Sequence, residues 1–586
     1  MNSPLTSLPY TDILNGNTAL GKNLGTERYS IVVLSNITIY PVKEILEYEL
    51  RRSGIPASVT VGQYDNIVQE SALQSSANAV IVWFELANLT ENLPGRALSM
   101  PESQVTELID KTKREISLVI EGLRGAPLVL FNLLSDLTIR PPQGFDQSLR
   151  RIVTKVNAHI AGTLQPNMVA VDLDRSISTV SVKRAVDWRT WYSSRLLYTV
   201  EFFKQYVSDI APVFLSLAGK TKKVLVFDCD NTLWKGIIGE DGMDGIRLSP
   251  HDKDGEPYHE VQMMARALAE RGILLALCSK NNPDDVDEVL NNHPEMVLRN
   301  EHFAIKRINW NDKVTNLKEI ARTLNLGLDS MVMVDDSEFE ASLIEQYLPE
   351  VHVLRVPRSI SEYPRFFRET LRLFHRGAST SEDARRTEMY KDQTARDAAR
   401  TRFENLDDYL ASLDLKLTIS VNDSSQVSRI AQLTQKTNQF NLTTKRYTEK
   451  DIATRLESSK WRIYSFSLAD RFGDFGLTGV AMLFLESESS AVIDTLLLSC
   501  RVLGRNAERS FLDGIVGDLR QQGIKKIYGM FIPTTKNSQV ASFYENKGFT
   551  IIENGEGSKR YVLDTDKYQS APPTYIQRRI QNGRTN

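Results

Sequence analysis

The sequence has few cysteines, little net charge and no long apolar run. Three widely separated cysteines among 586 residues exclude a disulfide framework and predict a reducing, cytoplasmic compartment. The formal net charge of −3 offers no basic field for nucleic acid. No apolar stretch reaches about 18 residues, so no membrane span is expected. The first residues lack the basic and then apolar order of a signal peptide.

The length and the pattern of apolar residues predict an α/β protein with several domains. A chain of 586 residues is expected to divide into about three or four of them. We expect an α/β domain at 1–218, a second α/β domain at 219–376, a charged helical linker at 377–402, a mixed α+β domain at 403–566 and a polar tail at 567–586.

The first segment alternates apolar strands with helical patterns, which predicts a parallel sheet. Its strands are expected at 29–34, 79–84 and 126–132. This layout resembles SGNH-hydrolase-like domains, with Ser35 at the nucleophile position and Asn132 at the asparagine position. That family ends with Asp-x-x-His, whereas this chain has Asp187 followed by Trp-Arg-Thr. A serine without a base is a weak nucleophile, so a docking or structural role is predicted.

Two acidic pairs follow apolar, strand-like runs in the second segment. Asp228 and Asp230 flank Cys229 after one run, and Asp335 and Asp336 follow another. Apolar runs that end abruptly in acids are typical of buried parallel strands, and ligands of open α/β sheets bind at that end. Carboxylates at this spacing can hold a hard cation such as Mg2+. The thiol between them is either reactive or a small buried hydrophobe.

A hydroxyl and an amine stand at two further element ends of this segment. Ser279 follows the apolar run 273–278, and Lys313 lies in the first turn of a helix that Asn311 or Asp312 is expected to cap. A cation in the first turn opposes the helix dipole, so its presence requires a reason. A phosphate bound at the site supplies one.

The order of these motifs resembles the haloacid dehalogenase (HAD) superfamily. The stretches 228–234, 239–242 and 311–313 further resemble FkbH-like proteins. Those proteins make a glyceryl thioester on an acyl carrier protein, starting from a phosphorylated glycerate. The chain departs from the family at Lys235, where glycine is common, and at Ser337 with Glu338, where Asn-Pro is common.

The resemblance implies a role for each motif residue. It places Mg2+ among four acids, Asp228, Asp230, Asp335 and Asp336. It places the substrate phosphate against Thr232, Ser279, Lys280, Asn281 and Lys313. Asp230 is also the candidate general acid or base, and Cys229 would carry the acyl group. In an extended backbone Cys229 points away from its neighbours, so it reaches the same pocket only if the chain turns directly after Asp228.

The last segment resembles the GNAT acetyltransferases. Strands expected at 480–485 and 491–500 precede a helix start that contains Arg501 and Gly504, where this family holds the CoA pyrophosphate on backbone N–H groups. Tyr544 stands at the general-acid position of a second signature. Asn506 occupies a position where a small residue is usual, which predicts weak or absent acetyl-CoA binding.

These expectations together describe an acyltransferase with Mg2+ as its cofactor. It would move a glyceryl-type acyl group from a phosphorylated three-carbon acid, such as 1,3-bisphosphoglycerate, to the phosphopantetheine thiol of an acyl carrier protein, through a thioester on Cys229. One alternative is a HAD-type phosphatase with Asp228 as nucleophile and Cys229 as packing. Two others are a GNAT-type N-acyltransferase in the last segment and a non-catalytic assembly factor for carrier proteins.

Overall fold

The computed structural model describes residues 4–375, 396, 403 and 405–583, apart from 23, 26, 27, 75, 143–146, 535 and 556. The linker expected at 377–402 therefore lies outside the described residues, except for residue 396. The chain divides into two compact units. Unit 1 comprises Met1–Ala218 with Tyr447–Asp451, and unit 2 comprises Gly219–Arg446 with Ile452–Asn586. Over the described ranges, no helix has both the length and the apolar character needed to cross a membrane.

Unit 1 is built on a parallel five-stranded sheet of order β2-β1-β3-β4-β5. The strands are β1 (Tyr29–Ser35), β2 (Ala57–Val61), β3 (Ala79–Trp83), β4 (Val129–Asn132) and β5 (Met168–Val171). The helices are α1 (Tyr10–Lys22), α2 (Pro41–Arg52), α3 (Ile67–Ser71), α4 (Leu93–Arg96), α5 (Glu102–Gly122), α6 (Ser148–Thr163), α7 (Leu173–Val180), α8 (Val182–Ala185), α9 (Trp188–Ser194) and α10 (Val200–Leu217). The alternation of strands and helices predicted for this segment is confirmed.

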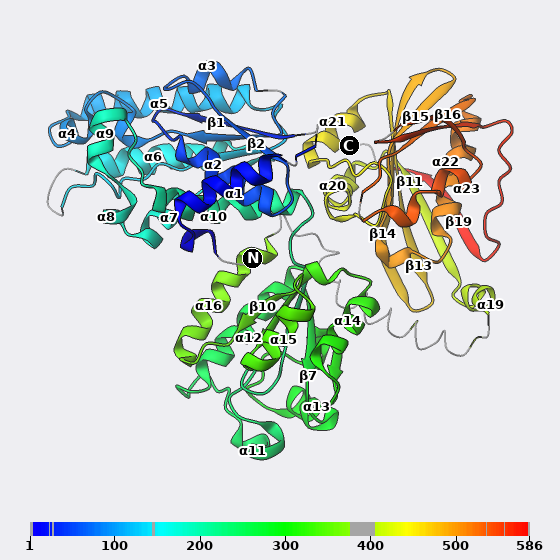
Figure 1. The fold of residues 1–586 in the computed structure, drawn as a ribbon. Helices are drawn as coiled ribbons and strands as arrows, with labels where there is room; N and C mark the ends of the chain where they lie inside the picture. The colour runs from blue at the N-terminus through cyan, green and yellow to red at the C-terminus, as the bar shows by residue number, and fades with distance from the viewer. Residues whose placement is uncertain are drawn as a thin grey trace. The chain divides into compact units, whose positions relative to one another are not determined.

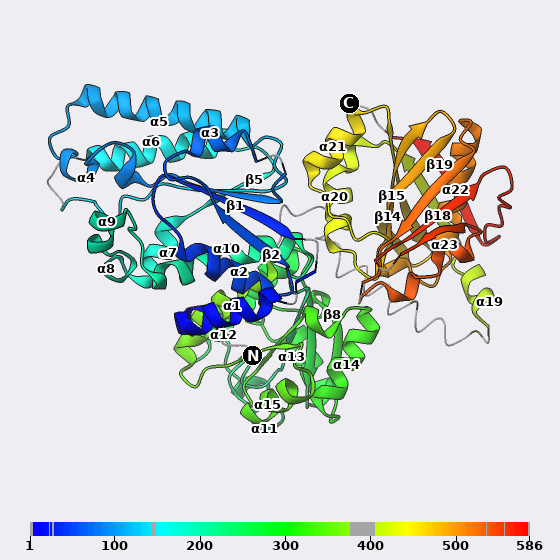
Figure 2. The same cartoon turned by 45° about the horizontal axis from the view of Figure 1, so that its top comes forward.

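Helices cover both faces of this sheet, as Figure 1 and the turned view in Figure 2 show. Helices α1, α2, α7 and α10 bury one apolar cluster, and α5 with α6 bury the other. Successive side chains of a strand point to opposite faces, so Ile81 of β3 lies in the first cluster and Val82 in the second. A strand buried on both faces needs apolar residues at every position, which explains its continuous apolar run.

Unit 2 contains a second parallel five-stranded sheet, of order β10-β9-β6-β7-β8. Its strands are β6 (Val224–Phe227), β7 (Leu274–Ser279), β8 (Phe303–Ile308), β9 (Met331–Asp335) and β10 (His352–Arg355). Its helices are α11 (Ile238–Gly245), α12 (Glu256–Glu270), α13 (Pro283–Asn292), α14 (Lys313–Leu324), α15 (Glu338–Tyr347) and α16 (Tyr363–Thr370). Because β6 lies between β7 and β9, the three predicted motif strands are neighbours, and their carboxyl ends share one edge.

Unit 2 also contains a mixed sheet of order β17-β18-β16-β15-β14-β13-β11-β19, with β12 paired to β15. The strands are β11 (Leu415–Val421), β12 (Phe440–Asn441), β13 (Trp461–Asp470), β14 (Gly473–Ser487), β15 (Ser490–Leu498), β16 (Lys526–Phe531), β17 (Thr550–Asn554), β18 (Lys559–Asp564) and β19 (Ile576–Asn582). The helices of this part are α19 (Leu406–Ala411), α20 (Val427–Lys436), α22 (Ala507–Gln521) and α23 (Phe543–Asn546), and α21 (Glu449–Glu457) begins in the segment Tyr447–Asp451 of unit 1 and ends in unit 2. The segment expected as a polar tail, 567–586, thus adds the edge strand β19, which pairs in parallel with β11.

Candidate active site

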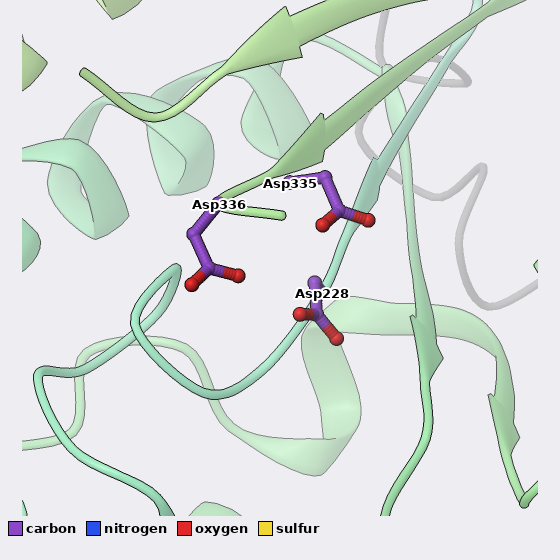
Figure 3. Close-up of side chains that lie close together, drawn as sticks. All are labelled: Asp228, Asp335 and Asp336. Carbon is purple, nitrogen blue, oxygen red and sulfur yellow. The ribbon is translucent and has the colours of Figure 1, made fainter. Parts of the chain in front are cut away.

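Three carboxylates meet at the carboxyl ends of β6 and β9. Asp228 directly follows β6, Asp335 is the last residue of β9, and Asp336 follows it. One oxygen from each lies within 4.8 Å of the others, and Figure 3 shows the three groups around one space. Asp228 is 7% exposed and Asp335 is 0% exposed, whereas Asp336 is exposed. Oxygen donors of this number and spacing suit a hard divalent cation such as Mg2+.

Lys313 provides the positive charge of this centre. Its Nζ lies 2.7 Å from Oδ2 of Asp335 and 3.2 Å from Oδ2 of Asp228. Burial lowers the pKa of Lys313, but attraction to the two carboxylates outweighs that effect and the net shift is upward. Three carboxylates against one ammonium leave two negative charges, which matches the charge of a divalent cation. The donor set therefore fits Mg2+.

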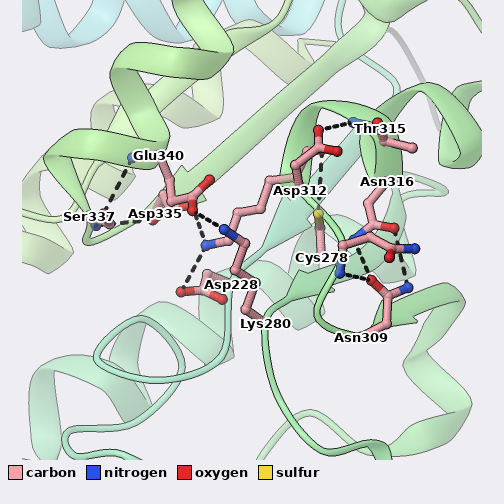
Figure 4. A network of polar contacts seen from close by, with 12 residues as sticks. Asp228, Cys278, Lys280, Asn309, Asp312, Thr315, Asn316, Asp335, Ser337 and Glu340 are labelled. Carbon is pink, nitrogen blue, oxygen red and sulfur yellow. Dashed lines mark hydrogen bonds and ion pairs between the residues drawn. The ribbon is translucent and has the colours of Figure 1, made fainter.

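The helix that carries Lys313 is fixed by a cap and by a pair of amides. The Asp312 carboxylate accepts a hydrogen bond from the Thr315 N–H at 2.8 Å, so the predicted cap is confirmed. Asn309 and Asn316 exchange side-chain hydrogen bonds of 3.2 and 2.9 Å, which Figure 4 shows beside the cap. The Asn309 N–H also donates to the carbonyl of Ser279 at 3.1 Å, which ties this loop to the end of β7. The sequence analysis assigned no role to Asn309 or to Asn316.

Cys229 lies next to the centre but points into the core. The chain turns after β6, with the Leu233 N–H donating to the Cys229 carbonyl at 2.8 Å. The side chain nevertheless follows Leu225 and Phe227 into one apolar cluster and is 0% exposed. Burial and the neighbouring Asp228 raise the pKa of the thiol well above its ordinary value, and a hydrogen bond with Ser279 offsets only part of this. In this conformation the thiol is a poor nucleophile.

Asp230 is held by three donors rather than by the carboxylate cluster. Its Oδ1 accepts hydrogen bonds from the Trp234 indole and the Ile238 N–H, both at 3.0 Å. Its Oδ2 accepts one of 2.8 Å from the Asn281 amide, so the structure places that amide on Asp230. Burial raises the pKa of Asp230, which favours the protonated form that a general acid requires. Trp234 follows Asp230 by only four positions, and the sequence analysis did not use this separation to predict their hydrogen bond.

Two further residues expected at the phosphate have other contacts. The Lys280 ammonium pairs with the Glu340 carboxylate at 2.6 Å, which Figure 4 shows beside the centre. Thr232 is 0% exposed, and its carbonyl accepts a hydrogen bond from the Tyr363 hydroxyl at 3.2 Å. Lys313, which was also expected at the phosphate, differs from these two residues. Its ammonium lies against the carboxylates of Asp228 and Asp335.

Comparisons with known proteins bear on the fold. No protein-family model matches the chain, and no curated protein sequence matches it. A solved structure of the N-terminal part of the protein BF1531 from Bacteroides fragilis, which contains a phosphatase domain and is complexed with Mg, is 22% identical, with a TM-score of 0.56. The alignment covers 63% of this chain and 100% of that chain. The described part of this chain therefore shares its α/β fold with that structure.

Acetyltransferases are also similar to part of the chain. The ribosomal-protein-S18-alanine N-acetyltransferase of Escherichia coli is 14% identical, covering 25% of this chain and 94% of that chain, with a TM-score of 0.21. The spermidine/spermine N-acetyltransferase SpeG of Vibrio cholerae, in complex with manganese ions, is 16% identical, covering 27% of this chain and 96% of that chain, again with a TM-score of 0.21. At TM-scores of 0.21 these similarities do not define the fold of the mixed sheet.

The mixed sheet contains a gap between two parallel strands, and the chain fills it. Strands β15 and β16 pair over only three residues, from Ser490 to Val492 on β15. Farther along, the Leu442 N–H donates to the Leu496 carbonyl at 3.1 Å, and the Ile532 N–H donates to the Leu442 carbonyl at 2.8 Å. The segment that includes β12 thus occupies, by hydrogen bonds, the backbone groups that an extended ligand would need in order to bind in this gap.

The residues expected to bind CoA or pantetheine do not form one open site. Arg501 follows β15, and its Nε donates to the Ser499 hydroxyl at 3.2 Å. Gly504 is exposed, whereas Tyr544 is 1% exposed among other aromatic rings. The Asn506 backbone has φ 59°, and its side-chain amide donates to the Tyr575 hydroxyl at 2.6 Å.

In unit 1, the residues expected at the positions of an SGNH-hydrolase site are already hydrogen-bonded to neighbouring groups. The Ser35 hydroxyl accepts from the Ile37 N–H at 3.1 Å, and the Asn132 side-chain oxygen accepts from the Tyr206 hydroxyl at 3.0 Å. The Asp187 carboxylate caps α9 through the Arg189 N–H at 2.9 Å. These contacts give each of the three side chains a structural role.

Proposed function

We propose that the chain is an enzyme that removes phosphate from a phosphorylated donor at the carboxylate centre, with Mg2+ as cofactor. The observation that carries this proposal is the meeting of Asp228, Asp335 and Asp336 within 4.8 Å, with Lys313 paired to two of them. Bound Mg2+ would neutralise charge on the phosphate oxygens. The similar BF1531 structure, which is complexed with Mg, supports the choice of metal.

The residues of the centre divide the chemistry between them. An Asp228 oxygen attacks phosphorus, the bond from phosphorus to the donor oxygen breaks, and the donor oxygen leaves with the electron pair. Asp230 donates a proton to that oxygen and then accepts one from the water that releases phosphate from Asp228. Lys313 holds Asp228 in place and stabilises charge as it develops on the phosphate. Glu340, paired with Lys280, keeps that second ammonium beside the centre.

A second candidate is acyl transfer, in which the donor is 1,3-bisphosphoglycerate and the acceptor is the phosphopantetheine thiol of an acyl carrier protein. The position of Cys229 directly after Asp228, at the carboxyl end of β6, favours it. The thiol would attack the acyl carbonyl, phosphate would leave with the bonding electrons, and the carrier thiol would then take the acyl group. Because Cys229 is 0% exposed, this reaction requires the segment after β6 to move. The phosphatase chemistry requires no such movement.

One experiment tests both candidates. The chain is incubated with 1,3-bisphosphoglycerate and Mg2+, with and without a carrier protein, and both phosphate release and intact masses are recorded. Under either candidate, Asp228→Asn loses phosphate release by at least about a hundredfold. The matched variant Ser35→Ala retains it, because Ser35 lies in the other unit. Normal turnover by Asp228→Asn, or undiminished turnover in EDTA, would show that the centre does not perform this chemistry.

The behaviour of Cys229 then separates the two candidates. A transferase forms an acyl adduct on Cys229 that hydroxylamine cleaves, and Cys229→Ser loses carrier loading because an alcohol without a base is a far weaker nucleophile. A phosphatase releases phosphate at the same rate in Cys229→Ser and never carries the acyl mass. From the burial of the thiol, we expect the second result.

A further inference from the structure

A polar cavity lies within unit 2 at the edge of the parallel sheet that is opposite to the carboxylates. Its volume is about 360 Å³. Lys223 lines it and directly precedes β6, and Ser330 lines it and directly precedes β9. The carboxylates follow these same strands at their other ends, so the cavity is separate from the candidate active site. Its other walls come from the residues before β6, the loop after α14, α20 with the residues that follow it, the end of β15 and Lys536.

Cationic side chains predominate in the lining of this cavity. The six lining cations are Lys220, Lys223, Arg429, Lys436, Arg501 and Lys536. The lining contains one carboxylate, that of Asp329, which pairs with the Lys536 ammonium at 2.5 Å. Desolvation by the cavity walls lowers the pKa of Lys220 and repulsion from Lys536 adds to this shift, although the side chain remains exposed to solvent. Such a cavity favours an anion that carries more than one negative charge.

The wall formed by α20 is arranged so that it does not repel an anion. The C-terminal carbonyls of a helix carry partial negative charge, which would oppose an anionic ligand. Here the Arg446 guanidinium donates to the carbonyls of Thr434 and Thr437, the latter at 3.0 Å, and covers them. It also donates to the side-chain oxygen of Asn438, which orients that lining amide and leaves its NH2 group to serve as a donor. Burial lowers the pKa of Arg446 to about 10, so it stays charged at neutral pH.

Close contacts fix the cavity walls. Gly219 has φ +68°, and a β-carbon at this position would collide with the Gln435 carbonyl, so the backbones can approach this closely only at a glycine. The Lys223 ammonium donates to the Lys436 carbonyl at 3.4 Å. Together with the ion pair of Lys536 and Asp329, these contacts join the sheet edge to α20 and to the loop that follows β16. The cavity is thus formed by the fold and does not depend on a ligand.

We propose that this cavity binds an organic phosphate ester that carries at least two negative charges. Arginine and lysine side chains are the donors that recognise phosphate oxygens, and the lining amides of Asn438 and Gln439 suit the hydroxyl or amide groups of the organic part. The apolar side chains of Leu326 and Leu433 complete the lining, which fits an ester better than a free inorganic ion. This proposal does not depend on the function proposed for the carboxylate centre.

Titration calorimetry with glycerol 3-phosphate tests the proposal. The full chain is used in EDTA at low ionic strength, so that without a divalent cation the three carboxylates repel the probe. We expect one site, an affinity that falls as salt is added, and no heat with uncharged glycerol. The double variant Lys220→Gln/Lys436→Gln should bind at least tenfold more weakly. The matched control Lys416→Gln/Lys567→Gln removes two exposed cations that lie outside the lining and should bind like the wild type.

The single variant Lys220→Gln protects the test against a folding defect, because this side chain is exposed. We expect it to weaken binding by about threefold, with an unchanged thermal unfolding curve. Three results would overturn the proposal: no binding of glycerol 3-phosphate by the wild type at millimolar concentration, equal affinity in the wild type and the cavity variants, or binding of glycerol as tight as that of its phosphate.

Discussion

The central strands of the two parallel sheets both lead into a buried acid, and the two acids behave differently. In unit 1, Glu85 follows β3, is 2% exposed and accepts hydrogen bonds from the Tyr198 hydroxyl at 2.7 Å and the Ala87 N–H at 3.3 Å. Burial raises its pKa to about 7, and these hydrogen bonds offset only part of that shift. In unit 2, Asp228 follows β6 and meets two more carboxylates and a lysine.

The contrast shows that an acid at a strand end is not by itself a functional site. Glu85 is a single acid, and its carboxyl oxygens accept hydrogen bonds from the neutral Tyr198 hydroxyl and Ala87 N–H. These contacts give the buried carboxyl group the partners that it needs. Asp228 belongs to a group in which carboxylates outnumber the ammonium, and that imbalance is stable only with a cation present or with protons bound. Desolvation by the surrounding protein, together with repulsion from Asp228, raises the pKa of Asp336 to about 6 although its side chain reaches solvent. The imbalance of charge, rather than the position on the sheet, distinguishes the site.

The largest expected effect comes from removing the ammonium of the centre. Lys313→Met leaves Asp228 and Asp335 buried without their counter-charge, so the free energy of unfolding at pH 7 should fall by about 3–5 kcal/mol. Phosphate release should fall by about 10²–10³-fold. Thermal unfolding with and without Mg2+ measures the first effect, and the metal should restore more stability to this variant than to the wild type.

Lys280→Met is the matched control for Lys313→Met. Its ammonium pairs with one carboxylate, that of Glu340, and is 37% exposed, so its removal should cost at most about 1 kcal/mol. Equal losses of stability in the two variants would mean that the three carboxylates do not form the electrostatic centre described above.

Glu85 gives the second effect, which depends on pH in unit 1. Its folded pKa of about 7 lies above the ordinary value of 4.5, so the stability linked to it is complete below pH 4.5 and is lost as the pH rises to 7. The loss should amount to about 3 kcal/mol between those limits. Glu85→Gln cannot ionise, so its free energy of unfolding should vary less over this range. Denaturant unfolding at pH 5 and pH 8, followed by tryptophan fluorescence, measures the difference.

Asp187→Asn serves as a control with the opposite sign. The hydrogen bond from Arg189 lowers the pKa of Asp187 to about 2, so its contribution is present above the ordinary value of 3.8 and is lost only at lower pH. Between pH 5 and pH 8 this variant should follow the wild type. A Glu85→Gln variant with the pH dependence of the wild type would show that Glu85 is ionised in the folded state.

The sequence was sufficient to predict features that depend on local pattern. The apolar runs before Asp228 and Asp335 predicted two buried strands, and residue type limited the helix cap to Asn311 or Asp312, of which the structure shows Asp312. Contacts between distant residues could not be predicted in this way. The bond from Asn281 to Asp230 spans 51 positions and the ion pair of Lys280 with Glu340 spans 60, so their partners depend on how the strands are ordered in the sheet.

The sequence left the role of Cys229 open between a reactive thiol and a buried side chain, and a tertiary contact decides between them. Cys229 lies between two acids in the sequence, but it lies on the same strand face as Leu225 and Phe227, and it points with them into the core. The gap between β15 and β16 was likewise hidden, because the residues that fill it lie some 50 positions before β15, at Phe440 and Leu442. In both cases the sequence pattern predicted the local strand, and contacts with residues distant in the sequence determined what the side chains or strands do.

The smallest expected effect concerns Asn506 and tests the filled gap. Glycine adopts a φ of 59° without steric cost, but Asn506→Gly loses the hydrogen bond to Tyr575, so stability should change by less than about 1 kcal/mol. If the asparagine side chain alone excluded CoA, the variant would bind acetyl-CoA. We expect no binding by calorimetry in either protein, because Leu442 is hydrogen-bonded to both strands and blocks the gap. Micromolar affinity in Asn506→Gly alone, about −8 kcal/mol, would show that crowding at this position is the real obstacle.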